Sequence, residues 1–336
     1  MKTLILQSPG VMEYIDSVKP MMKEGFSMLR VKRIGVCGTD IHAYEGTQPY
    51  FEYPRVLGHE LALEFIEGDA EGFKKGEHVT CMPYFYCGAC AACRKGHTNC
   101  CSNLKVFGVH QHGGMSEFVI VPSYSLLHAE GLSDDELAWI EPLAVAAHGI
   151  DRAKVQPGET VLVIGAGPIG VGLMEMAHVA KANVIAMDVS DQRLDFCRDK
   201  LGVKDVINPL TMNALSKLKE ITNNELPEVV IDATGSLKAM ENAFQYIGQA
   251  GRFVLVGIQK EPIAFSHPDF HKREATLMSS RNATQKDFEH SINCLRKKLI
   301  RPTSYKLNYV HFSEVKDEFP KWLNAERPLK TMIIMD

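Results

Sequence analysis

The sequence lacks any long run of apolar residues. The N-terminal stretch MKTLILQSPG places only Leu4, Ile5 and Leu6 in succession before Pro9 and Gly10. That run is too short for the hydrophobic core of a signal peptide, and no later segment approaches the roughly 18 apolar residues of a membrane-spanning helix. We therefore expect a cytoplasmic protein, in a reducing compartment where structural disulfides are uncommon.

A strong excess of charge of either sign is also lacking. The 37 Lys and Arg residues nearly balance the 41 Asp and Glu residues, for a formal net charge of −4. This balance provides no electrostatic reason to expect binding to nucleic acid or to an anionic membrane. We find no internal repeat and no low-complexity segment. A chain of 336 residues exceeds what one hydrophobic core usually supports, so we expect two domains.

Strand-like and helix-like runs divide the chain into parts of different character. From about residue 30 to 125, short runs such as SMLRVKRIGV and GMSEFVIVP alternate with turns, which favours an antiparallel, barrel-like domain. Beyond residue 158, buried strands such as ETVLVIG and NVIAMD alternate with helix-compatible segments, as in a doubly wound parallel sheet. The predicted fold class is α/β plus mostly β. We place a mostly β domain at 1–149, an α/β domain at 150–284 and a return to the first domain at 285–336.

A glycine-rich loop opens the α/β part. The motif G-x-G-x-x-G follows a buried strand and begins a helix, which is the context that dinucleotide binding requires, although such turns also occur without a nucleotide. Asp188 ends the next strand, where a carboxylate accepts hydrogen bonds from ribose hydroxyls and repels a 2′-phosphate. NAD is therefore favoured over NADP, and Arg193 softens that exclusion. The predicted loop residues are Gly165, Gly167, Pro168, Ile169 and Gly170.

Five of the nine cysteines lie between Cys87 and Cys101. Two residues separate Cys87 from Cys90 and Cys90 from Cys93, and either Cys100 or Cys101 can supply a fourth thiolate. Four thiolates close a tetrahedral shell around zinc and leave no open position, so such a site is structural. Unpaired thiols or a redox switch are the alternatives to zinc.

A second, sparser set of residues has the character of a catalytic zinc site. Cys37, His59 and Glu60 supply one sulfur, one imidazole and one carboxylate, which leave a position for a substrate oxygen. Each alone would usually be a core or turn residue. Thr39 and His42 add a hydroxyl and an imidazole that can carry an alcohol proton to solvent.

With these residues in view, the sequence resembles the zinc-dependent medium-chain dehydrogenases, which include alcohol, threonine and sorbitol dehydrogenases. The resemblance covers essentially the whole chain and rests on VCGTDIH, VLGHE, the four-cysteine loop, VLVIGAGPIG and VLVGI. It implies a GroES-like catalytic domain, a Rossmann NAD-binding domain, two zinc ions per chain and a homodimer or homotetramer.

The resemblance also implies roles for individual residues. Cys37 and His59 match the catalytic zinc ligands, Glu60 matches a glutamate that binds zinc directly or through water, and Thr39 with His42 matches the proton relay. Glu141 stands where simple alcohol dehydrogenases have a cysteine ligand, so it is expected to face the metal through water or to bind it transiently. The family spacing selects Cys101 as the fourth structural ligand and leaves Cys100 as a spare thiol.

On the cofactor side, the resemblance assigns Asp188 and Arg193 to the ribose. It places the strand end Val256, Gly257 and Ile258 against the nicotinamide. A segment that closes over cofactor and substrate is matched by Ser280, Arg281 and Asn282.

For the substrate, one departure from sorbitol dehydrogenases matters. Their substrate-contacting tyrosine follows the relay histidine, where this chain has Ala43 and then Tyr44. The sequence is more similar to the bacterial sugar-acid branch, in QPYFEYPRVLGHE, GVHQHGGMSEF and FHKREATLMSSRNAT. This favours oxidation of a secondary hydroxyl of an aldonate such as L-galactonate or L-gulonate. A basic cluster could receive the carboxylate, or part of it could be solvated surface charge; it comprises His271, Lys272, Arg273 and Arg281.

Three other functions share part of this sequence pattern. A polyol or another secondary alcohol is the alternative substrate. A catalytically silent, zinc-stabilised dinucleotide sensor would keep the glycine loop and the four cysteines but need not keep the five sparse residues. A zinc-free quinone reductase fails on the same five, which are Cys37, Thr39, His42, His59 and Glu60.

Overall fold

The computed structural model describes residues 1–49, 51–305, 307–324 and 328–335. It divides into two compact units: Met1–Glu141 with Ala283–Asp336, and Pro142–Asn282. Of the predicted closing segment 285–336, residues 306, 325–327 and 336 lie outside the described part. The domain boundaries predicted after residues 149 and 284 stay a prediction.

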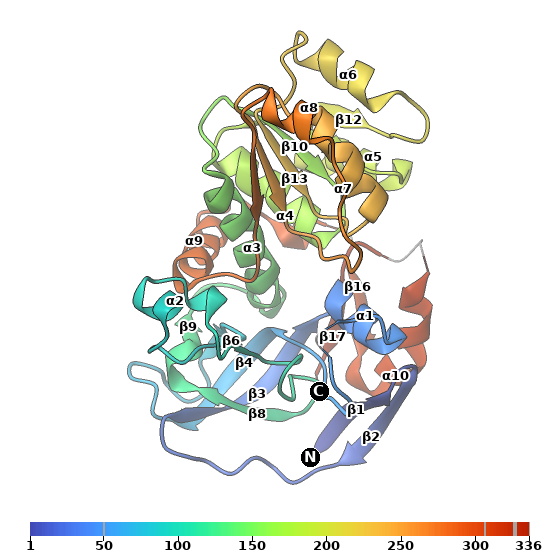
Figure 1. Ribbon diagram of the computed structural model, residues 1–336. Coiled ribbons are helices and arrows are strands. Elements are labelled where there is room, and N and C mark those ends of the chain that lie inside the picture. The colour runs from blue at the N-terminus through green and yellow to red at the C-terminus, as the bar shows by residue number, and fades with distance from the viewer. Residues whose placement is uncertain (50, 306, 325–327, 336) are drawn as a thin grey trace. The chain divides into compact units, whose positions relative to one another are not determined.

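The first unit is built on a mostly antiparallel sheet with strand order β16-β17-β3-β4-β5-β9, and β8 also pairs with β3 (Figure 1). Only β16 and β17 run parallel to each other, which returns the end of the chain to the sheet formed by its beginning. Two further pairs are β1-β2 and β6-β7. The strands of this unit are β1 (Lys2–Ser8), β2 (Val11–Asp16), β3 (Phe26–Gly35), β4 (Glu60–Gly68), β5 (His78–Cys81), β6 (Tyr84–Phe85), β7 (Lys105–Val106), β8 (Phe118–Pro122), β9 (Leu126–His128), β16 (Asn308–His311) and β17 (Thr331–Ile334).

Helices of this unit are short apart from two. They are α1 (Gly38–Glu45), α2 (Ala91–Arg94), α9 (Gln285–Arg296) and α10 (Val315–Glu318), while α3 (Asp134–Ala153) begins here and continues into the second unit. Single 3₁₀ turns are η1 (Thr98–Cys100), η2 (Ser123–Ser125), η3 (Phe244–Tyr246), η4 (Pro302–Ser304), η5 (Phe312–Glu314) and η6 (Phe319–Leu323), of which η3 belongs to the second unit.

The second unit is a six-stranded, all-parallel sheet in the order β12-β11-β10-β13-β14-β15. Chain order runs outward from β10 in both directions, so the sheet is doubly wound as predicted. Helix α4 packs on β10 and β11, and α7 packs on β13 (Figure 1). The strands are β10 (Thr160–Ile164), β11 (Asn183–Met187), β12 (Asp205–Ile207), β13 (Val229–Asp232), β14 (Arg252–Leu255) and β15 (Thr276–Ser279). The helices are α4 (Pro168–Val179), α5 (Asp191–Leu201), α6 (Ala214–Ile221), α7 (Leu237–Ala243) and α8 (His267–His271).

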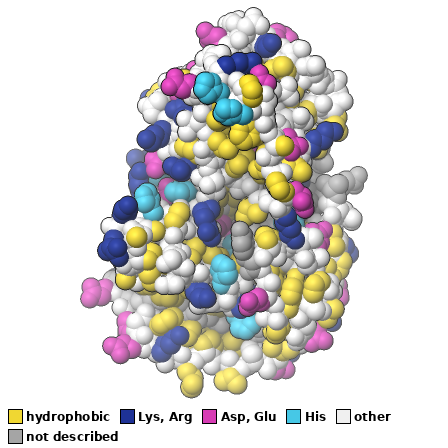
Figure 2. All heavy atoms as spheres, in the orientation of Figure 1, with side chains coloured by type: hydrophobic (Ala, Val, Ile, Leu, Met, Phe, Trp, Pro, Cys, Tyr) yellow, Lys and Arg dark blue, Asp and Glu magenta, His cyan; other side chains and the backbone are white. Residues whose placement is uncertain are grey.

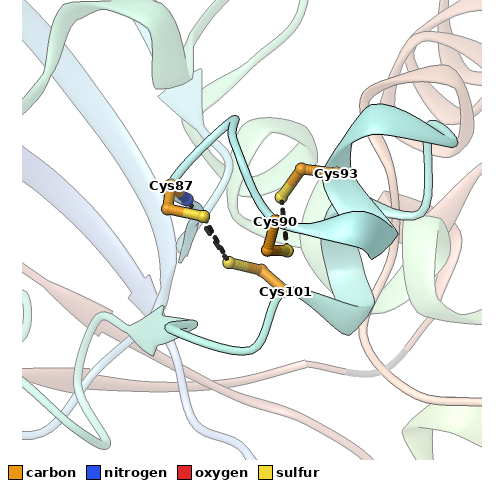
Figure 3. Close-up of side chains that lie close together, drawn as sticks. All are labelled: Cys87, Cys90, Cys93 and Cys101. Atoms are coloured by element: carbon orange, nitrogen blue, oxygen red, sulfur yellow. Dashed lines mark hydrogen bonds between the residues drawn. The ribbon is translucent and has the colours of Figure 1, made fainter.

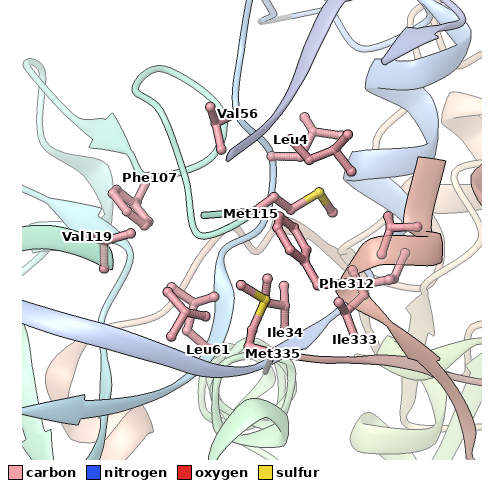
Figure 4. Packing of buried hydrophobic residues seen from close by; sticks show 14 of the residues in the cluster. Leu4, Ile34, Val56, Leu61, Phe107, Met115, Val119, Phe312, Ile333 and Met335 are labelled. Atoms are coloured by element: carbon pink, nitrogen blue, oxygen red, sulfur yellow. The ribbon is translucent and has the colours of Figure 1, made fainter. Parts of the chain in front are cut away.

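A row of three side chains crosses the centre of the first unit's sheet. Ile34 on β3 pairs with Leu61 on β4 on one side and with Ile333 on β17 on the other, and all three are buried (Figure 4). Because strand side chains alternate between faces, the next residue on each strand points to the opposite face. That second row comprises Met332, Gly35 and Glu60.

The surface agrees with the balanced composition. On the face that Figure 2 shows, basic and acidic side chains are interspersed rather than gathered by sign. None of the helices in the described part of the chain is long and apolar enough to cross a membrane. All nine cysteines are free thiols.

We predict that Ile34→Ala lowers the free energy of unfolding of the first unit by about 2–5 kcal/mol, because buried methyl and methylene groups of the side chain are removed and a cavity remains. Urea unfolding followed by tryptophan fluorescence reports this unit alone, since the two tryptophans, Trp139 and Trp322, both lie in it. Val18→Ala is the matched control: Val18 is 87% exposed, so its loss should change stability by less than about 0.5 kcal/mol. Equal effects of the two changes would contradict the central position of Ile34.

Candidate active site and metal centres

Three predicted ligands meet at the start of β4. Cys37 is the N-cap residue of α1, His59 directly precedes β4 and Glu60 is its first residue. One ligand atom from each, a sulfur, a ring nitrogen and a carboxylate oxygen, lies within 4.8 Å of the others. His59 and Glu60 are buried, whereas Cys37 is partly exposed. The set therefore combines mixed ligand types with one ligand, Cys37, that is partly exposed to solvent.

Asp40 supports two of these ligands from α1. Its Oδ2 accepts a hydrogen bond from the Cys37 backbone N–H at 3.0 Å, and its Oδ1 accepts from the Gly58 N–H at 3.3 Å. Asp40 Oδ1 also lies 3.7 Å from His59 Nδ1, which has no hydrogen-bond partner among the described residues. A carboxylate on one side of an imidazole fixes which ring nitrogen is free to bind a metal. Burial lowers the pKa of His59, but the nearby Asp40 and Cys37 charges raise it well above its usual value.

Glu141 lies near this set without joining it. The residues that meet within 4.8 Å are Cys37, His59 and Glu60, and Glu141, on α3, instead accepts a hydrogen bond from the buried Tyr84 hydroxyl. Burial raises the pKa of Glu141 to about 7, against the lowering effect of His59. Burial also raises the pKa of Tyr84, which keeps its hydroxyl protonated as a donor. Whether Glu141 faces the metal through water stays a prediction.

The two residues of the predicted proton relay lie on α1. Thr39 is half-buried, and the His42 side chain is 59% exposed. His42 Nδ1 lies 3.2 Å from Thr47 Oγ1 and 3.4 Å from Glu45 Oε2. His42 is thus in contact with solvent, as the outer end of a relay must be, and the relay itself stays a prediction.

The cysteine loop brings four sulfur atoms together (Figure 3). Cys90 and Cys93 sulfurs are 3.4 Å apart, and Cys87 and Cys101 sulfurs are 3.5 Å apart. Backbone N–H groups of Cys93 and Ser102 lower the pKa of Cys90 to about 5. Cys100 is exposed and outside this group of four. Four sulfurs with no other donor fit a closed zinc shell, and the mixed set at Cys37 fits a zinc that keeps an open position.

The glycine loop has the close contacts that its motif requires. Gly165, with φ of 99°, follows β10, and a Cβ there would lie 2.9 Å from Thr234 Cγ2. A Cβ on Gly170 would collide with the Gly165 carbonyl oxygen. Gly167 is the N-cap of α4 and Pro168 and Ile169 are its first residues, so the helix N-terminus is directed at the loop, where a pyrophosphate would be stabilised. Asp188 accepts hydrogen bonds from the N–H groups of Ala166 at 2.6 Å and Ser190 at 2.9 Å.

The sequence reading missed Asp232, whose backbone carbonyl accepts from the N–H groups of Val256 and Gly257 in the predicted nicotinamide segment and whose carboxylate holds the neighbouring loop after β13. Asp232 is fully buried at the end of β13 and accepts from Thr234 Oγ1 at 2.8 Å and from the Gly235 N–H at 3.3 Å. A Cβ on Gly257 would lie 3.0 Å from Asp232 Oδ1, and one on Gly235 would lie 2.7 Å from the Ile258 carbonyl oxygen. The loops after β13 and β14 can therefore approach only because both positions are glycine.

The remaining predicted residues of this unit differ in their surroundings. Val256 donates its N–H to the Asp232 carbonyl, and Arg193 donates its N–H to the Ser190 side chain that caps α5. Ser280 is buried, and its hydroxyl has no partner among the described residues; Asn282 has a left-handed φ of 52°. Arg281 is exposed.

The basic cluster does not act as one group. Lys272 Nζ is 2.6 Å from Asp269 Oδ1, and Arg273 donates to the Asp269 carbonyl at 2.7 Å, so both are engaged on α8. The His271 ring lies 5.7 Å from that of His267. Tyr44 likewise packs its ring 4.9 Å from that of Phe319.

Comparison with known proteins gives consistent matches. The family model for zinc-binding dehydrogenases matches residues 168–297, and that for the alcohol dehydrogenase GroES-like domain matches residues 23–131. L-galactonate-5-dehydrogenase of Escherichia coli (strain K12) is 41% identical over 290 residues, covering 86% of this chain and 85% of the relative. The chain belongs to the zinc-type medium-chain alcohol and polyol dehydrogenases.

Further relatives of this dehydrogenase agree. Sorbitol dehydrogenase of Halalkalibacterium halodurans is 30% identical over 308 residues, with 89% of this chain and 90% of the relative covered. A crystal structure of a short chain alcohol dehydrogenase (rspB) from Escherichia coli CFT073, complexed with NADH, superimposes with a TM-score of 0.91 at 31% identity and covers 99% of both chains. The predicted family, the fold class with its GroES-like domain, and an oxidoreductase acting on CH–OH groups are confirmed.

The sequence reading of this dehydrogenase missed three buried supports of the first unit's site. Asp40 could have been found from the sequence, because it lies within the VCGTDIH motif, one helical turn after Cys37. Tyr84 and Lys330 could not, since their partners Glu141 and Glu60 are 57 and 270 residues away in the chain.

We predict two zinc ions per chain with separable roles. Cys37→Ala should abolish turnover while one zinc and the folded state remain. Cys90→Ala should remove the other zinc and lower stability, because binding at a closed site contributes to folding directly. Metal analysis and thermal unfolding of both variants test this, with Cys100→Ala as the control that should keep both ions. One zinc in the wild-type protein would contradict the two-site assignment.

Proposed function

We propose that this dehydrogenase oxidises a secondary hydroxyl of a six-carbon sugar acid, such as L-galactonate or L-gulonate, to a ketone with NAD as the hydride acceptor. The observation that carries the proposal is the three-ligand set of Cys37, His59 and Glu60, which differs from the four-sulfur set by leaving a coordination position for substrate. A polyol substrate remains the second candidate, supported by the similarity to a sorbitol dehydrogenase.

Cys37, His59 and Glu60 would hold the catalytic zinc, which when bound supplies Lewis acidity toward an alcohol oxygen. Asp40 keeps the His59 ring oriented so that the nitrogen away from Asp40 faces the metal. Thr39 would accept the alcohol proton as it gives up its own hydroxyl proton toward His42, and His42, whose side chain is 59% exposed, would release a proton to water.

The glycine loop would hold the dinucleotide. The α4 N-terminus and the loop N–H groups bind the pyrophosphate, and Asp188 receives the ribose hydroxyls. A nicotinamide there supplies the hydride acceptor, and the segment Val256–Ile258 would lie against its ring. The crystal structure of the 31% identical relative in complex with NADH supports this choice of cofactor.

Support for a sugar acid comes from two directions. L-galactonate-5-dehydrogenase shares 41% identity over most of both chains. Within the basic cluster we assign Arg281 to the substrate carboxylate, because it is exposed and follows the end of β15. A planar guanidinium can hold a carboxylate bidentately and so select which hydroxyl reacts.

We also propose that the protein forms a homodimer or homotetramer. In the described part of the chain, β15 pairs only with β14, so it forms one edge of the six-stranded sheet. Leu277 on that strand is 40% exposed. An unpaired edge strand with an exposed apolar side chain is suited to pairing with a second copy. A cytoplasmic location also stays a prediction.

For the cofactor, we predict that the wild-type protein has a higher kcat/KM with NAD than with NADP, and that Asp188→Ala lowers the ratio of these two values by about tenfold. Removing the carboxylate removes its repulsion of a 2′-phosphate, which at close range is worth up to about 4 kcal/mol near a protein surface. The measurement is kcat/KM with each cofactor. Asp195→Ala is the control and should leave the ratio of kcat/KM with NAD to kcat/KM with NADP unchanged. Asp195 is an exposed acidic residue that pairs with Arg198. A wild-type preference for NADP would refute the assignment of Asp188.

For the substrate, a panel of aldonates, polyols and simple alcohols read by NADH absorbance should give the highest kcat/KM for L-galactonate or L-gulonate. Arg281→Ala should erode that preference by about tenfold or more, since a hydrogen bond to a charged group contributes about 1.5–3 kcal/mol, and this loss should exceed the loss of affinity for NAD. Lys272→Ala is the control with no expected effect, because Lys272 is paired with Asp269. Equal or better efficiency with sorbitol or a short aliphatic alcohol would show that the sugar-acid proposal is wrong.

A further inference from the structure

A lysine is buried beside the candidate catalytic metal site. The side chain of Lys330 is 0% exposed, and its Nζ forms an ion pair with Glu60 Oε2. The same Nζ lies 5.2 Å from the centre of the Trp139 ring. Glu60 is thus contacted by an ammonium group, while one of its carboxylate oxygens lies within 4.8 Å of the ligand atoms of Cys37 and His59.

The sheet, not a flexible loop, places Lys330 there. The Lys330 carbonyl accepts from the Asn308 N–H at 3.0 Å, and the next residue, Thr331, accepts from the Val36 N–H at 3.0 Å. Lys330 is two residues before Met332, so it points to the same sheet face as Met332 and Glu60.

Gly35 leaves the space that the ion pair occupies. It is the β3 residue paired with Glu60 and with Met332. A Cβ on Gly35 would collide with the Glu60 carboxylate and would lie 3.0 Å from Lys330 Cε. The three neighbouring strands β3, β4 and β17 therefore fix this pair together: β3 leaves the space, β4 carries Glu60, and Lys330 directly precedes β17.

The pair constrains what Glu60 can do. A buried ammonium group without a counter-charge is strongly destabilising, and Glu60 is the carboxylate that the described residues provide to Lys330 Nζ. A movement that took the whole carboxylate away from Lys330 would therefore be opposed. The ammonium charge also withdraws electron density from the carboxylate and weakens it as a metal ligand.

We propose that Lys330 is a positioning residue that holds the Glu60 carboxylate in competition with the metal, so that the coordination position of Glu60 itself stays exchangeable. This inference rests on the proposed catalytic metal at Cys37, His59 and Glu60. Lys330 then influences whether substrate can replace Glu60, although it contacts neither substrate nor cofactor.

The test compares Lys330→Met, which keeps the length of the side chain but removes the charge, with Lys330→Arg, which keeps a charge. In Lys330→Met, release of the Cys37-dependent zinc to a chelator should be slower by tenfold or more, because Glu60 then binds the metal without competition. With cobalt in that site, the visible absorption should weaken as coordination increases, and kcat should fall. Lys330→Arg should restore faster release and part of the kcat.

If Lys330 only stabilised the fold, Lys330→Met should have the opposite effect on zinc release. The disordered site would then release zinc faster than the wild-type protein. The double variant Glu60→Gln with Lys330→Met removes both charges, and adding Lys330→Met to Glu60→Gln should no longer slow zinc release. Lys321→Met is the matched control, since Lys321 pairs with Glu318 at 2.5 Å on the surface.

The two proposals fail in different ways. If the wild-type protein contains no zinc that depends on Cys37, the catalytic metal site and the role of Lys330 are both wrong. If that zinc is present but Lys330→Met releases it no more slowly than the wild type, only the role of Lys330 is wrong. Failure to turn over sugar acids would leave the zinc-release result valid.

Discussion

The position of β3 between β4 and β17 is the constraint on which the first unit depends. The register pairs Ile34 with Leu61 and Ile333 on one face of the sheet, and Gly35 with Glu60 and Met332 on the other. One face therefore builds the hydrophobic core while the opposite face receives the carboxylate of the candidate site. A shift of one residue would exchange the two faces, burying Glu60 in the core. Core packing thus protects the geometry of the site.

The two candidate metal centres are held in different ways. All four sulfur ligands of the cysteine loop come from a segment of fifteen residues. The Cys101 sulfur accepts hydrogen bonds from the backbone N–H groups of Cys87 and Asn103, which are also close in the chain. The Cys37 set needs α1, the start of β4 and, through Lys330, a strand near the end of the chain. The residues of the four-cysteine centre are thus close together in the chain, whereas the Cys37 centre depends on segments that are far apart in the chain. This difference suits a site that maintains a loop and a site that must exchange a ligand.

Most regular elements could be read from the sequence because their hydrophobic pattern is strong. NVIAMD is the strand β11, and IGVGLMEMAHVAKA coincides with most of α4. Other segments deviate where tertiary contacts override the pattern. GMSEFVIVP enters its strand only at Phe118, because the residues before it bond other parts of the chain: the N–H groups of Gly114 and Met115 donate to the carbonyls of Gly58 and Leu57. In LKAMENAFQYIG the α-helix ends at Ala243 and tightens into the 3₁₀ turn Phe244–Tyr246, with Phe244 packed on Phe253.

The sequence by itself determined the family, the doubly wound sheet, the glycine loop and the two sets of metal-type residues, because each depends on residue type and spacing along the chain. Only the tertiary structure decided which side chains support them. Asp40 against His59, Tyr84 against Glu141 and Lys330 against Glu60 are all buried polar contacts. The last two join positions 57 and 270 residues apart, which strand register and burial bring together and which no local pattern encodes.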